Sequence, residues 1–329
     1  MKIIEIDKNS ENQRLDKFLL KYFNKAGKSF IYKMLRKKRI KYNGGKASGN
    51  EILKSGDLLQ MYLAEETINS FMEAKEIQKV EQNFQIVYED ENIIICNKPE
   101  GVSVQRDSDN KENSLNDQLL YYLYEKGEYI PQKDSVFTPS ICNRLDRNTS
   151  GIVLFGKNLK AVQALNKIIK ERKIDKFYLT ILKGVIDESG VIEAYHLKNS
   201  ENNKVEIFKD YRDGSKKIIT KYKRIAENGE YSLSEVDLIT GKAHQIRAGF
   251  KFIGFSIIGD RKYGDREVNS FFKGKYGLEN QFLHSYKIVF REGCGFFDYL
   301  AGKEFKAPLC PKKEKIVLDL FSGVGEMFR

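Results

Sequence analysis

The spacing of apolar residues near the start of the chain predicts a short amphipathic helix. Its stripe follows positions i, i+3, i+4 and i+7 and consists of Leu15, Phe18, Leu19 and Tyr22. Ser10 and Gln13 precede this stripe at the spacing of a capping box, in which side chains bond free backbone amides of the first turn. We therefore expect a helix that begins just after these two residues and buries the stripe.

A second helix is expected directly after the first, followed by a β-hairpin. Ser29 can cap the N-terminus of this helix. The positions that face inward are Ile31, Met34 and Leu35. A short strand at 40–44 then enters an Asn-Gly turn, and a returning strand follows at 58–63. Two short helices and a hairpin are thus expected to form a small N-terminal domain over residues 1–63.

The rest of the chain reads as a polar linker followed by a larger domain. Residues 64–83 lack Gly, Pro and a convincing apolar stripe, so we interpret them as the linker. Beyond them, runs of β-branched and aromatic residues predict strands at 84–88, 93–96, 152–155, 177–182, 218–222 and 231–239. A helical stripe runs through 159–171. Because few helices interrupt the strands, we expect a mixed α+β domain over 84–311 with a largely antiparallel sheet. The segment 312–329 should add a terminal helix.

Composition excludes several classes of protein. With 41% hydrophobic and 12% aromatic residues among 329, the chain can bury cores and is not expected to be disordered. No apolar run approaches the roughly 20 residues that span a bilayer, and residues 1–7 do not resemble a signal peptide, so we expect a cytoplasmic protein with no membrane partner. Four isolated cysteines and three distant histidines offer little from which to build a metal site.

Most of the positive charge lies in the first 64 residues. The chain has 57 Lys and Arg against 46 Asp and Glu, a net charge of +11, and residues 1–64 hold 15 of the former and 6 of the latter. Such a cationic surface attracts polyanions by releasing their counterions, and nucleic acid is the commonest such partner. The densest cluster comprises Lys33, Arg36, Lys37, Lys38, Arg39 and Lys41. A solvated helix face is the alternative interpretation.

One loop of the larger domain concentrates charge. Asp146 lies between Arg144 and Arg147, just before the strand at 152–155, and nearby positive charge favours the ionised form of a carboxylate. An ordinary solvated Arg-Asp-Arg loop would give the same local pattern. Phosphate-binding glycine loops, nucleophile elbows and the H-E-x-x-H motif are absent, which argues against the usual nucleotide, hydrolase and metalloprotease functions.

The N-terminal domain resembles the S4 RNA-binding module of ribosomal and RNA-modifying proteins. The likeness covers residues 12–63 and rests on the order of four stretches: Arg14 to Leu19, Ser29 to Ile40, Tyr42-Asn43-Gly44 and Gly56-Asp57. It implies that this domain binds structured RNA through phosphate and shape contacts.

The larger domain resembles pseudouridine synthases of the RluA family, the type that modifies large-subunit ribosomal RNA. The likeness runs from about Phe84 to Pro311 and rests on the segments 144–151, 176–178, 238–247, 258–264 and 283–284. An S4 module ahead of this domain is typical of the ribosomal members, whereas minimal transfer-RNA members lack it. Three positions depart from the family pattern, where His, Arg and Thr are usual: Asn143, Lys242 and Ala243.

The resemblance implies a reaction that needs no metal or organic cofactor, and it assigns residues to that reaction. Asp146 would be the essential carboxylate, acting on the ribose as a nucleophile or as a base, with Arg247 as its counter-ion. Tyr178 would stack on a flipped uracil and handle its C5 proton. Arg144 would fill the space that the extruded base leaves. The remaining candidate RNA contacts of this domain are Arg147, Lys98 and Lys262.

Three further residues of these segments receive structural interpretations. His244 is expected to be a hydrogen-bonded residue that orients its loop, and Gly241 and Gly259 are expected to serve the backbone through positive φ or a close approach of RNA. The predicted function is the isomerisation of specific uridines in 23S ribosomal RNA by a monomer. The alternatives are the same chemistry on transfer RNA and a non-catalytic RNA-binding factor of ribosome assembly.

Overall fold

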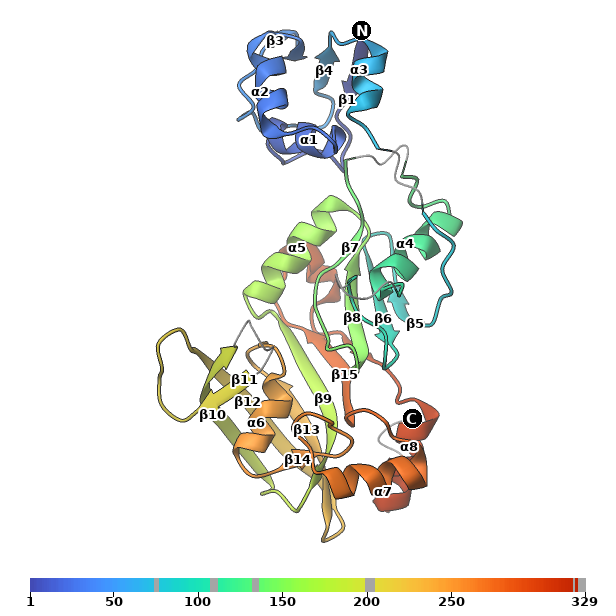
Figure 1. The fold of residues 1–329 in the computed structure, drawn as a ribbon, viewed down its shortest axis with the longest axis vertical. Coiled ribbons are helices and arrows are strands. Elements are labelled where there is room, and N and C mark those ends of the chain that lie inside the picture. Colours follow the sequence, from blue (N-terminus) through green and yellow to red (C-terminus); the bar gives the residue numbers. More distant parts are fainter. Residues whose placement is uncertain (74–76, 107–111, 132–135, 199–204, 322, 325–329) are drawn as a thin grey trace. The chain divides into compact units, whose positions relative to one another are not determined.

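The computed structural model describes residues 1–73, 77–106, 112–131, 136–198, 205–321 and 323–324 (Figure 1). The chain forms two compact parts, which we describe separately. The first part comprises residues 1–82, 117–140 and 156–163, and the second comprises 83–116, 141–155 and 164–329. The three candidate catalytic residues all belong to the second part: Asp146, Tyr178 and Arg247.

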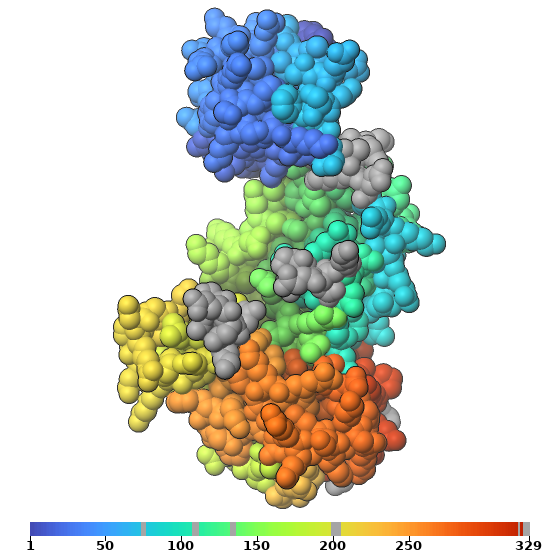
Figure 2. Space-filling view, viewed as in Figure 1, coloured from blue at the N-terminus to red at the C-terminus, as the bar shows by residue number. Residues whose placement is uncertain are grey.

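The first part begins with the two predicted helices and a small sheet, a closely packed body that is blue in Figure 2. The helices are α1 (Leu15–Tyr22) and α2 (Lys28–Arg36). The sheet has the order β1-β4-β2-β3, with β1 (Lys2–Glu5), β2 (Ile40–Tyr42), β3 (Gly45–Lys46) and β4 (Leu58–Met61). The predicted stripe of α1 is confirmed, since all four of its residues are buried in one hydrophobic cluster. Asn43 and Gly44 turn the hairpin with positive φ, as an Asn-Gly turn requires.

Both predicted helix caps are wrong. Arg14 is the N-cap of α1 and makes no side-chain capping bond, while Gln13 donates from Nε2 to the carbonyl oxygen of Ser10 at 2.9 Å. The first amides of α1 donate instead to backbone carbonyls in the segment 49–51. Ser29 lies inside α2 and not at its cap. Partners from a distant segment replaced the local ones that capping-box spacing predicted.

The expected polar linker begins with a short helix that belongs to the first part. Helix α3 (Glu65–Ser70) buries Ile68 in the same hydrophobic cluster as α1 and α2, and Phe71 and Met72 pack against that cluster. The linker interpretation is therefore corrected for residues 65–72. The helix offers one buried apolar side chain, too few to form a stripe in the sequence.

A sheet carries the second part. Its strand order is β11-β10-β12-β13-β9-β15-β8-β6-β5, with β14 on β9, β16 on β15 and β7 on β8. The bounds are β5 (Gln85–Glu89), β6 (Ile93–Lys98), β7 (Ser140–Ile141), β8 (Ser150–Gly156), β9 (Ile174–Lys183), β10 (Ser189–Lys198), β11 (Val205–Phe208), β12 (Lys216–Glu227), β13 (Tyr231–Leu238), β14 (Ser256–Ile257), β15 (Leu283–Phe290) and β16 (Glu304–Lys306). Among the pairings whose register is described, β15 with β8 is parallel and the others are antiparallel. The expected α+β class with a largely antiparallel sheet is confirmed.

The remaining helices are α4 (Leu115–Glu125), α5 (Leu159–Lys170), α6 (Gln245–Phe252), α7 (Arg266–Tyr276), a 3₁₀ helix (Gly295–Leu300) and α8 (Pro311–Leu320). The predicted terminal helix is present as α8, which buries Ile316 and Val317 in a cluster with Phe282. Residues 322 and 325–329 of the predicted tail lie outside the described residues. None of the described helices is both long and apolar enough to cross a membrane.

Candidate active site

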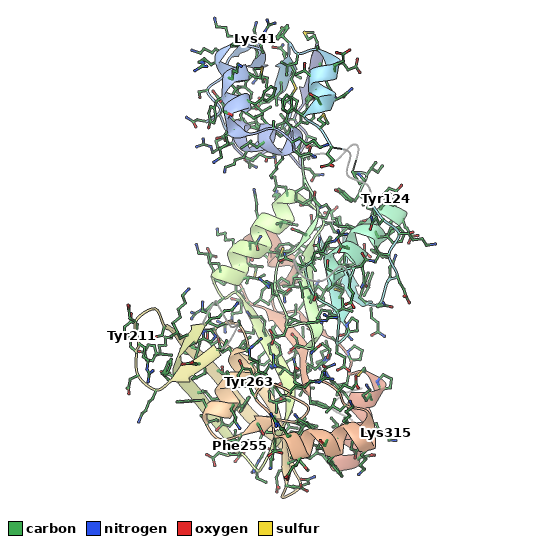
Figure 3. All side chains as sticks on the ribbon, in the orientation of Figure 1. Lys41, Tyr124, Tyr211, Phe255, Tyr263 and Lys315 are labelled. Atoms are coloured by element: carbon green, nitrogen blue, oxygen red, sulfur yellow. The ribbon has the colours of Figure 1, made fainter. Side chains whose placement is uncertain are left out.

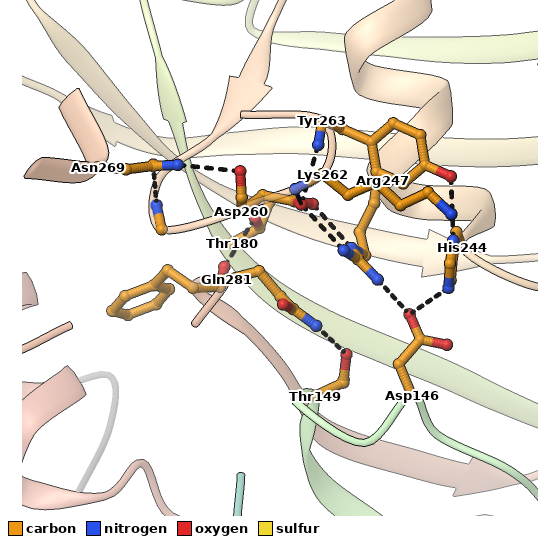
Figure 4. A network of polar contacts seen from close by, with 12 residues as sticks. Asp146, Thr149, Thr180, His244, Arg247, Asp260, Lys262, Tyr263, Asn269 and Gln281 are labelled. Atoms are coloured by element: carbon orange, nitrogen blue, oxygen red, sulfur yellow. Dashed lines mark hydrogen bonds and ion pairs between the residues drawn. The ribbon is translucent and has the colours of Figure 1, made fainter. Parts of the chain in front are cut away.

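Asp146 lies in the turn that leads into β8, and backbone bonds fix this turn. Its carbonyl oxygen accepts from the amide of Thr149 at 3.0 Å, and the next carbonyl, of Arg147, accepts from the amide of Gly101 at 3.0 Å. Gln281 donates from Nε2 to Thr149 Oγ1 at 3.2 Å (Figure 4). The Asp146 side chain keeps 28% of its surface exposed. The carboxylate is thus held in place yet open to a ligand.

Arg247, in the first turn of α6, joins Asp146 to a second carboxylate. Its Nη1 donates to Asp146 Oδ2 at 2.9 Å (Figure 4). Its Nε and Nη2 donate to the two oxygens of Asp260 at 2.7 and 2.9 Å, a bidentate pair. The structure therefore brings Asp146 and Arg247 together as the family resemblance implies, although they are 101 residues apart.

Asp260 is a site residue to which the sequence interpretation gave no role. It is completely buried, and besides Arg247 it accepts from the amides of Lys262 and Tyr263 at 2.9 and 3.1 Å. Burial alone would raise the pKa of Asp260, but hydrogen bonds and the charge of Arg247 outweigh it and lower that pKa. Burial would likewise lower the pKa of Arg247, yet the two carboxylates raise it. The guanidinium therefore stays charged and fixed.

His244 also faces Asp146. The residue immediately precedes α6 with a left-handed φ of 53°, which aims its ring at the site. His244 Nδ1 lies 3.0 Å from Tyr263 Oη, and Nε2 lies 3.9 Å from Asp146 Oδ2 (Figure 4). Burial, together with the charges of Arg247 and Lys262, lowers the pKa of His244 despite the opposing effect of Asp146. The ring is therefore neutral at neutral pH, and it is a hydrogen-bonded part of the site.

Tyr178 stands on β9 close to the carboxylate. In the sheet it is paired with Val236 on β13 and Ser285 on β15, and only 5% of its surface is exposed. Burial raises the pKa of Tyr178 to about 12, and the charge of Asp146 adds to the shift against a hydrogen bond with Ser285. The phenol is therefore protonated and lies within the field of Asp146.

Lys98 is buried and not accessible to RNA phosphates, contrary to the sequence interpretation. It is fully buried, and its Nζ donates to the carbonyl oxygens of Pro99, Val102 and Arg147 at 2.8, 2.8 and 2.9 Å. Burial lowers the pKa of Lys98 to about 7, and the charge of Lys313 contributes. Because the ammonium is enclosed by backbone oxygens, it braces the turn that carries Asp146. In the sequence alone, nothing around Lys98 distinguishes it from a surface lysine.

The other basic candidates are at the surface. Arg144 is exposed and makes no hydrogen bond to another described residue. Arg147 donates to the carbonyl of Gly101 at 2.8 Å and pairs with Glu112 at 2.6 Å, and Lys262 is exposed beside Tyr263.

The basic cluster of the first part is solvent-facing. Five of its members are exposed and Lys41 is half-buried at the surface, with its Nζ 5.2 Å from the centre of the Tyr62 ring (Figure 3). No salt bridge joins any of the six to another described residue. Their charges are available to an external polyanion.

The two glycines of interest differ. Gly259 has φ +76°, and a Cβ there would lie 2.3 Å from the carbonyl oxygen of Asn280, so the backbone role is met. Gly241 lacks positive φ and has open space around it, so the expectation of a positive φ at Gly241 is wrong.

Asn143, which departs from the family pattern, accepts from the amide of Leu154 at 2.7 Å and donates to the carbonyl of Ile152 at 3.3 Å. This departure is therefore accommodated by the backbone of β8.

The assembled group is a carboxylate held by a permanently charged guanidinium, next to a protonated phenol and a neutral imidazole. Such a carboxylate can attack an electrophilic carbon or remove a proton. Among the described residues, no group of three or more His, Cys, Asp or Glu side chains is placed to hold a metal ion.

Comparison with known proteins gives consistent matches. Residues 92–251 match the family described as RNA pseudouridylate synthase. The chain is 32% identical over 296 residues to an uncharacterized RNA pseudouridine synthase of Mycoplasma genitalium, covering 87% of this chain and 88% of that protein. It is 29% identical over 324 residues to the ribosomal large subunit pseudouridine synthase C of Vibrio parahaemolyticus, covering 97% and 96%. The fold is similar to that of human RNA pseudouridylate synthase domain containing 4, with a TM-score of 0.56, 20% identity, and 71% and 91% of the two chains covered.

Proposed function

The chain belongs to the RNA pseudouridylate synthase family, and on this premise we propose that it isomerises specific uridines of 23S ribosomal RNA. Support for this substrate comes from relatives named ribosomal large subunit pseudouridine synthase C and D, among them the Vibrio parahaemolyticus protein. The observation that carries the proposal is the partly exposed Asp146 carboxylate, 2.9 Å from the guanidinium of Arg247. In this proposal the protein works in the cytoplasm as a monomer.

The reaction is an isomerisation, so no atom is gained or lost overall. The N1–C1′ bond of uridine breaks, the base rotates, and a C5–C1′ bond forms. The hydrogen on C5 then leaves as a proton, and N1 takes up a proton. Asp146 acts on the ribose, either as the nucleophile at C1′ or as the base at C2′, and both routes need the ionised carboxylate. Arg247 places its positive charge 2.9 Å from this carboxylate, and Asp260 holds Arg247.

Access to the target base requires that the base leave its stack. Arg144 is exposed close to Asp146 in the chain, and its planar guanidinium can stack and form hydrogen bonds in the vacated space. Tyr178 offers an aromatic surface for the flipped uracil, and its protonated hydroxyl lies within the field of Asp146. Arg147 and Lys262 supply phosphate contacts at the rim.

The first part of the molecule recruits the RNA. Its exposed basic cluster at 33–41 attracts phosphates through counterion release, and the order of helices and hairpin that holds this cluster resembles that of an S4 module. In this proposal the first part contributes affinity, while the second part contributes chemistry.

The test is to incubate the purified full chain with unmodified transcripts of 23S ribosomal RNA and of transfer RNA, and then to map pseudouridine in both. We expect conversion at discrete sites of the ribosomal transcript and none with Asp146→Ala. Conversion confined to transfer RNA would overturn the proposed substrate. Binding without conversion, on every transcript and on assembling ribosomal particles, would favour the non-catalytic alternative.

A further inference from the structure

A chain of buried polar groups lies behind the turn that carries Asp146. Lys313, on α8, has no exposed surface, and its Nζ donates to Ser150 Oγ at 3.0 Å and to the carbonyl oxygen of Leu283 at 3.4 Å. The same Nζ lies 3.5 Å from Glu100 Oε2. Ser150 Oγ in turn lies 2.9 Å from His284 Nδ1. None of these contacts touches the carboxylate itself.

The positions of the hydrogens in this chain follow from its partners. His284 Nε2 lies 3.0 Å from the carbonyl oxygen of Ala307, which can only accept, so Nε2 carries the hydrogen. Burial and the charge of Lys313 lower the pKa of His284 to about 3, so Nδ1 is a free acceptor. The Ser150 hydroxyl therefore donates to His284 and accepts from Lys313. The donor and the acceptor of each of these hydrogen bonds are therefore fixed.

This chain acts where the catalytic turn meets the sheet. Ser150 opens β8 directly after Thr149, whose amide closes the turn on Asp146. Here β8 runs parallel to β15, with Ser150 opposite His284. At the next position, Gly151, a Cβ would lie 2.2 Å from the carbonyl oxygen of Ser285, so the two strands are in close contact. A shift of Ser150 would therefore move the turn and its carboxylate.

Packing alone does not require a charge at residue 313. Burial lowers the pKa of Lys313, and the charge of Glu100 opposes this shift. An apolar side chain of similar length often packs with equal or greater stability than a buried polar one. What the Lys313 Nζ adds is a pair of directed hydrogen bonds, because it donates to one hydroxyl and one carbonyl on two neighbouring strands. Its contribution is therefore expected in geometry more than in stability.

We propose that Lys313 is a positioning residue, through which α8 fixes Ser150 and so the placement of Asp146 against Arg247. This inference rests on the proposed role of Asp146 in catalysis. Helix α8 then becomes a working component of the active site, although it contributes no group to the reacting atoms. A displacement of about 1 Å can cost on the order of 100-fold in rate, so a small loss of direction is measurable.

The experiment compares Lys313→Met with the matched control Lys315→Met in the full chain. Lys315 lies on the exposed face of the same helix (Figure 3). Isomerisation is followed under single-turnover conditions, with enzyme in excess over an RNA that carries tritium at C5 of uridine, since that hydrogen is released to water. We expect Lys313→Met to lower the rate constant at saturation by on the order of 10- to 100-fold with an unchanged half-saturation concentration. Lys315→Met should match the wild type.

This readout separates positioning from stability. An unfolded fraction lowers the concentration of active enzyme and raises the apparent half-saturation concentration, but it leaves the rate constant at saturation unchanged. Ser150→Ala removes the acceptor without adding volume, and it decides the question alone if Lys313→Met does not fold. The Lys313→Met/Ser150→Ala double variant should be no slower than the slower single variant, because both substitutions remove the same hydrogen bond.

A saturating rate constant within twofold of the wild type in the folded Lys313→Met variant would overturn the inference. Fully multiplicative effects of the two substitutions would overturn it as well, since they would show independent roles. A wild-type protein that converts no RNA would instead overturn the proposed function, and this inference with it.

Discussion

The basic cluster of the first part and three buried Lys and Arg side chains of the second part have opposite environments. In the first part, the cluster at 33–41 is surface-exposed and makes no described salt bridge. In the second part, Lys98, Arg247 and Lys313 are buried, and carbonyl, hydroxyl or carboxylate oxygens surround each of them. An exposed cation attracts a mobile polyanion, whereas a buried one fixes particular oxygen atoms. Net charge therefore indicates the region that we propose recruits RNA. It gives no information about the proposed active site, where opposite charges cancel.

The strongest test of this contrast is the removal of a buried cation. Arg247→Met would leave the fully buried Asp260 without its counter-ion, which we expect to lower the free energy of unfolding by about 3–5 kcal/mol. Isomerisation should fall by at least about 100-fold, because Asp146 also loses its partner. Urea unfolding and single-turnover rates measure the two effects.

A second substitution separates these two effects. Asp260→Asn added to Arg247→Met removes the stranded charge, so it should restore much of the stability and none of the activity. A single Arg247→Met variant as stable as the wild type would show that the buried ion pair is not needed for stability. Buried and exposed cations would then not differ in their effect on folding.

The next effect is the pH dependence of stability that arises from His284, one of the buried polar groups behind the Asp146 turn. The pKa of His284 is about 3 in the folded protein against an ordinary value of 6.5, so below pH 6.5 the unfolded state binds a proton that the folded state lacks. Stability is therefore lost as pH falls from about 6.5 towards 3, by up to about 1.4 kcal/mol per pH unit from this residue. His284→Gln should show a shallower loss over this range. Parallel curves for the two proteins would mean that His284 is not held neutral.

A smaller effect is expected from the exposed cations of the first part. Replacing Lys33, Arg36 and Lys37 with Gln should raise the half-saturation concentration for RNA by about 10-fold and reduce the salt dependence by about two counterions. The rate constant at saturation and the unfolding free energy should not change. The matched control replaces three exposed lysines of the second part, Lys303, Lys306 and Lys315. Equal increases in the half-saturation concentration for both triple variants would mean that the effect depends on net charge and not on the position of the cluster.

The smallest effect sharpens the contrast within one residue type. Arg147 pairs with Glu112 at the surface, where both side chains stay largely in water. Arg147→Gln should change the free energy of unfolding by less than about 0.5 kcal/mol, against the several kcal/mol expected for Arg247→Met. A large loss of stability in a denaturant titration would contradict the distinction between exposed and buried cations.

Local patterns in the sequence predicted the elements whose signal is periodic. The stripe of α1, the helix α5 and strands such as β13 alternate or repeat clearly, and all are present. Strand β15 was not predicted because nearly every position is buried, which removes the alternation of apolar and polar residues that marks a strand. The short helix α3 was not predicted because Ile68 is its single buried residue, which is too few to form an apolar stripe.

The site was predictable where the resemblance to a family identified its residues. Asp146, Tyr178 and Arg247 do lie together, yet no local pattern in the sequence links residues so distant. Asp260 belonged to a segment that carried the resemblance, but its burial and its pairing depend on the tertiary fold. Lys98 and Lys313 could not be told from surface lysines, because burial of a single charged residue depends on segments far away in the chain.

We propose that the chemistry depends on the Asp146 carboxylate of the second part, while RNA affinity comes mainly from other residues. The most direct measurement is a single-turnover time course with Asp146→Asn at an enzyme concentration that saturates the RNA, with binding measured on the same samples. Asparagine keeps the shape and an oxygen for Arg247 but loses the negative charge. We predict RNA affinity within threefold of the wild type and a rate at least about 10⁴-fold lower. Conversion within tenfold of the wild-type rate would contradict the claim.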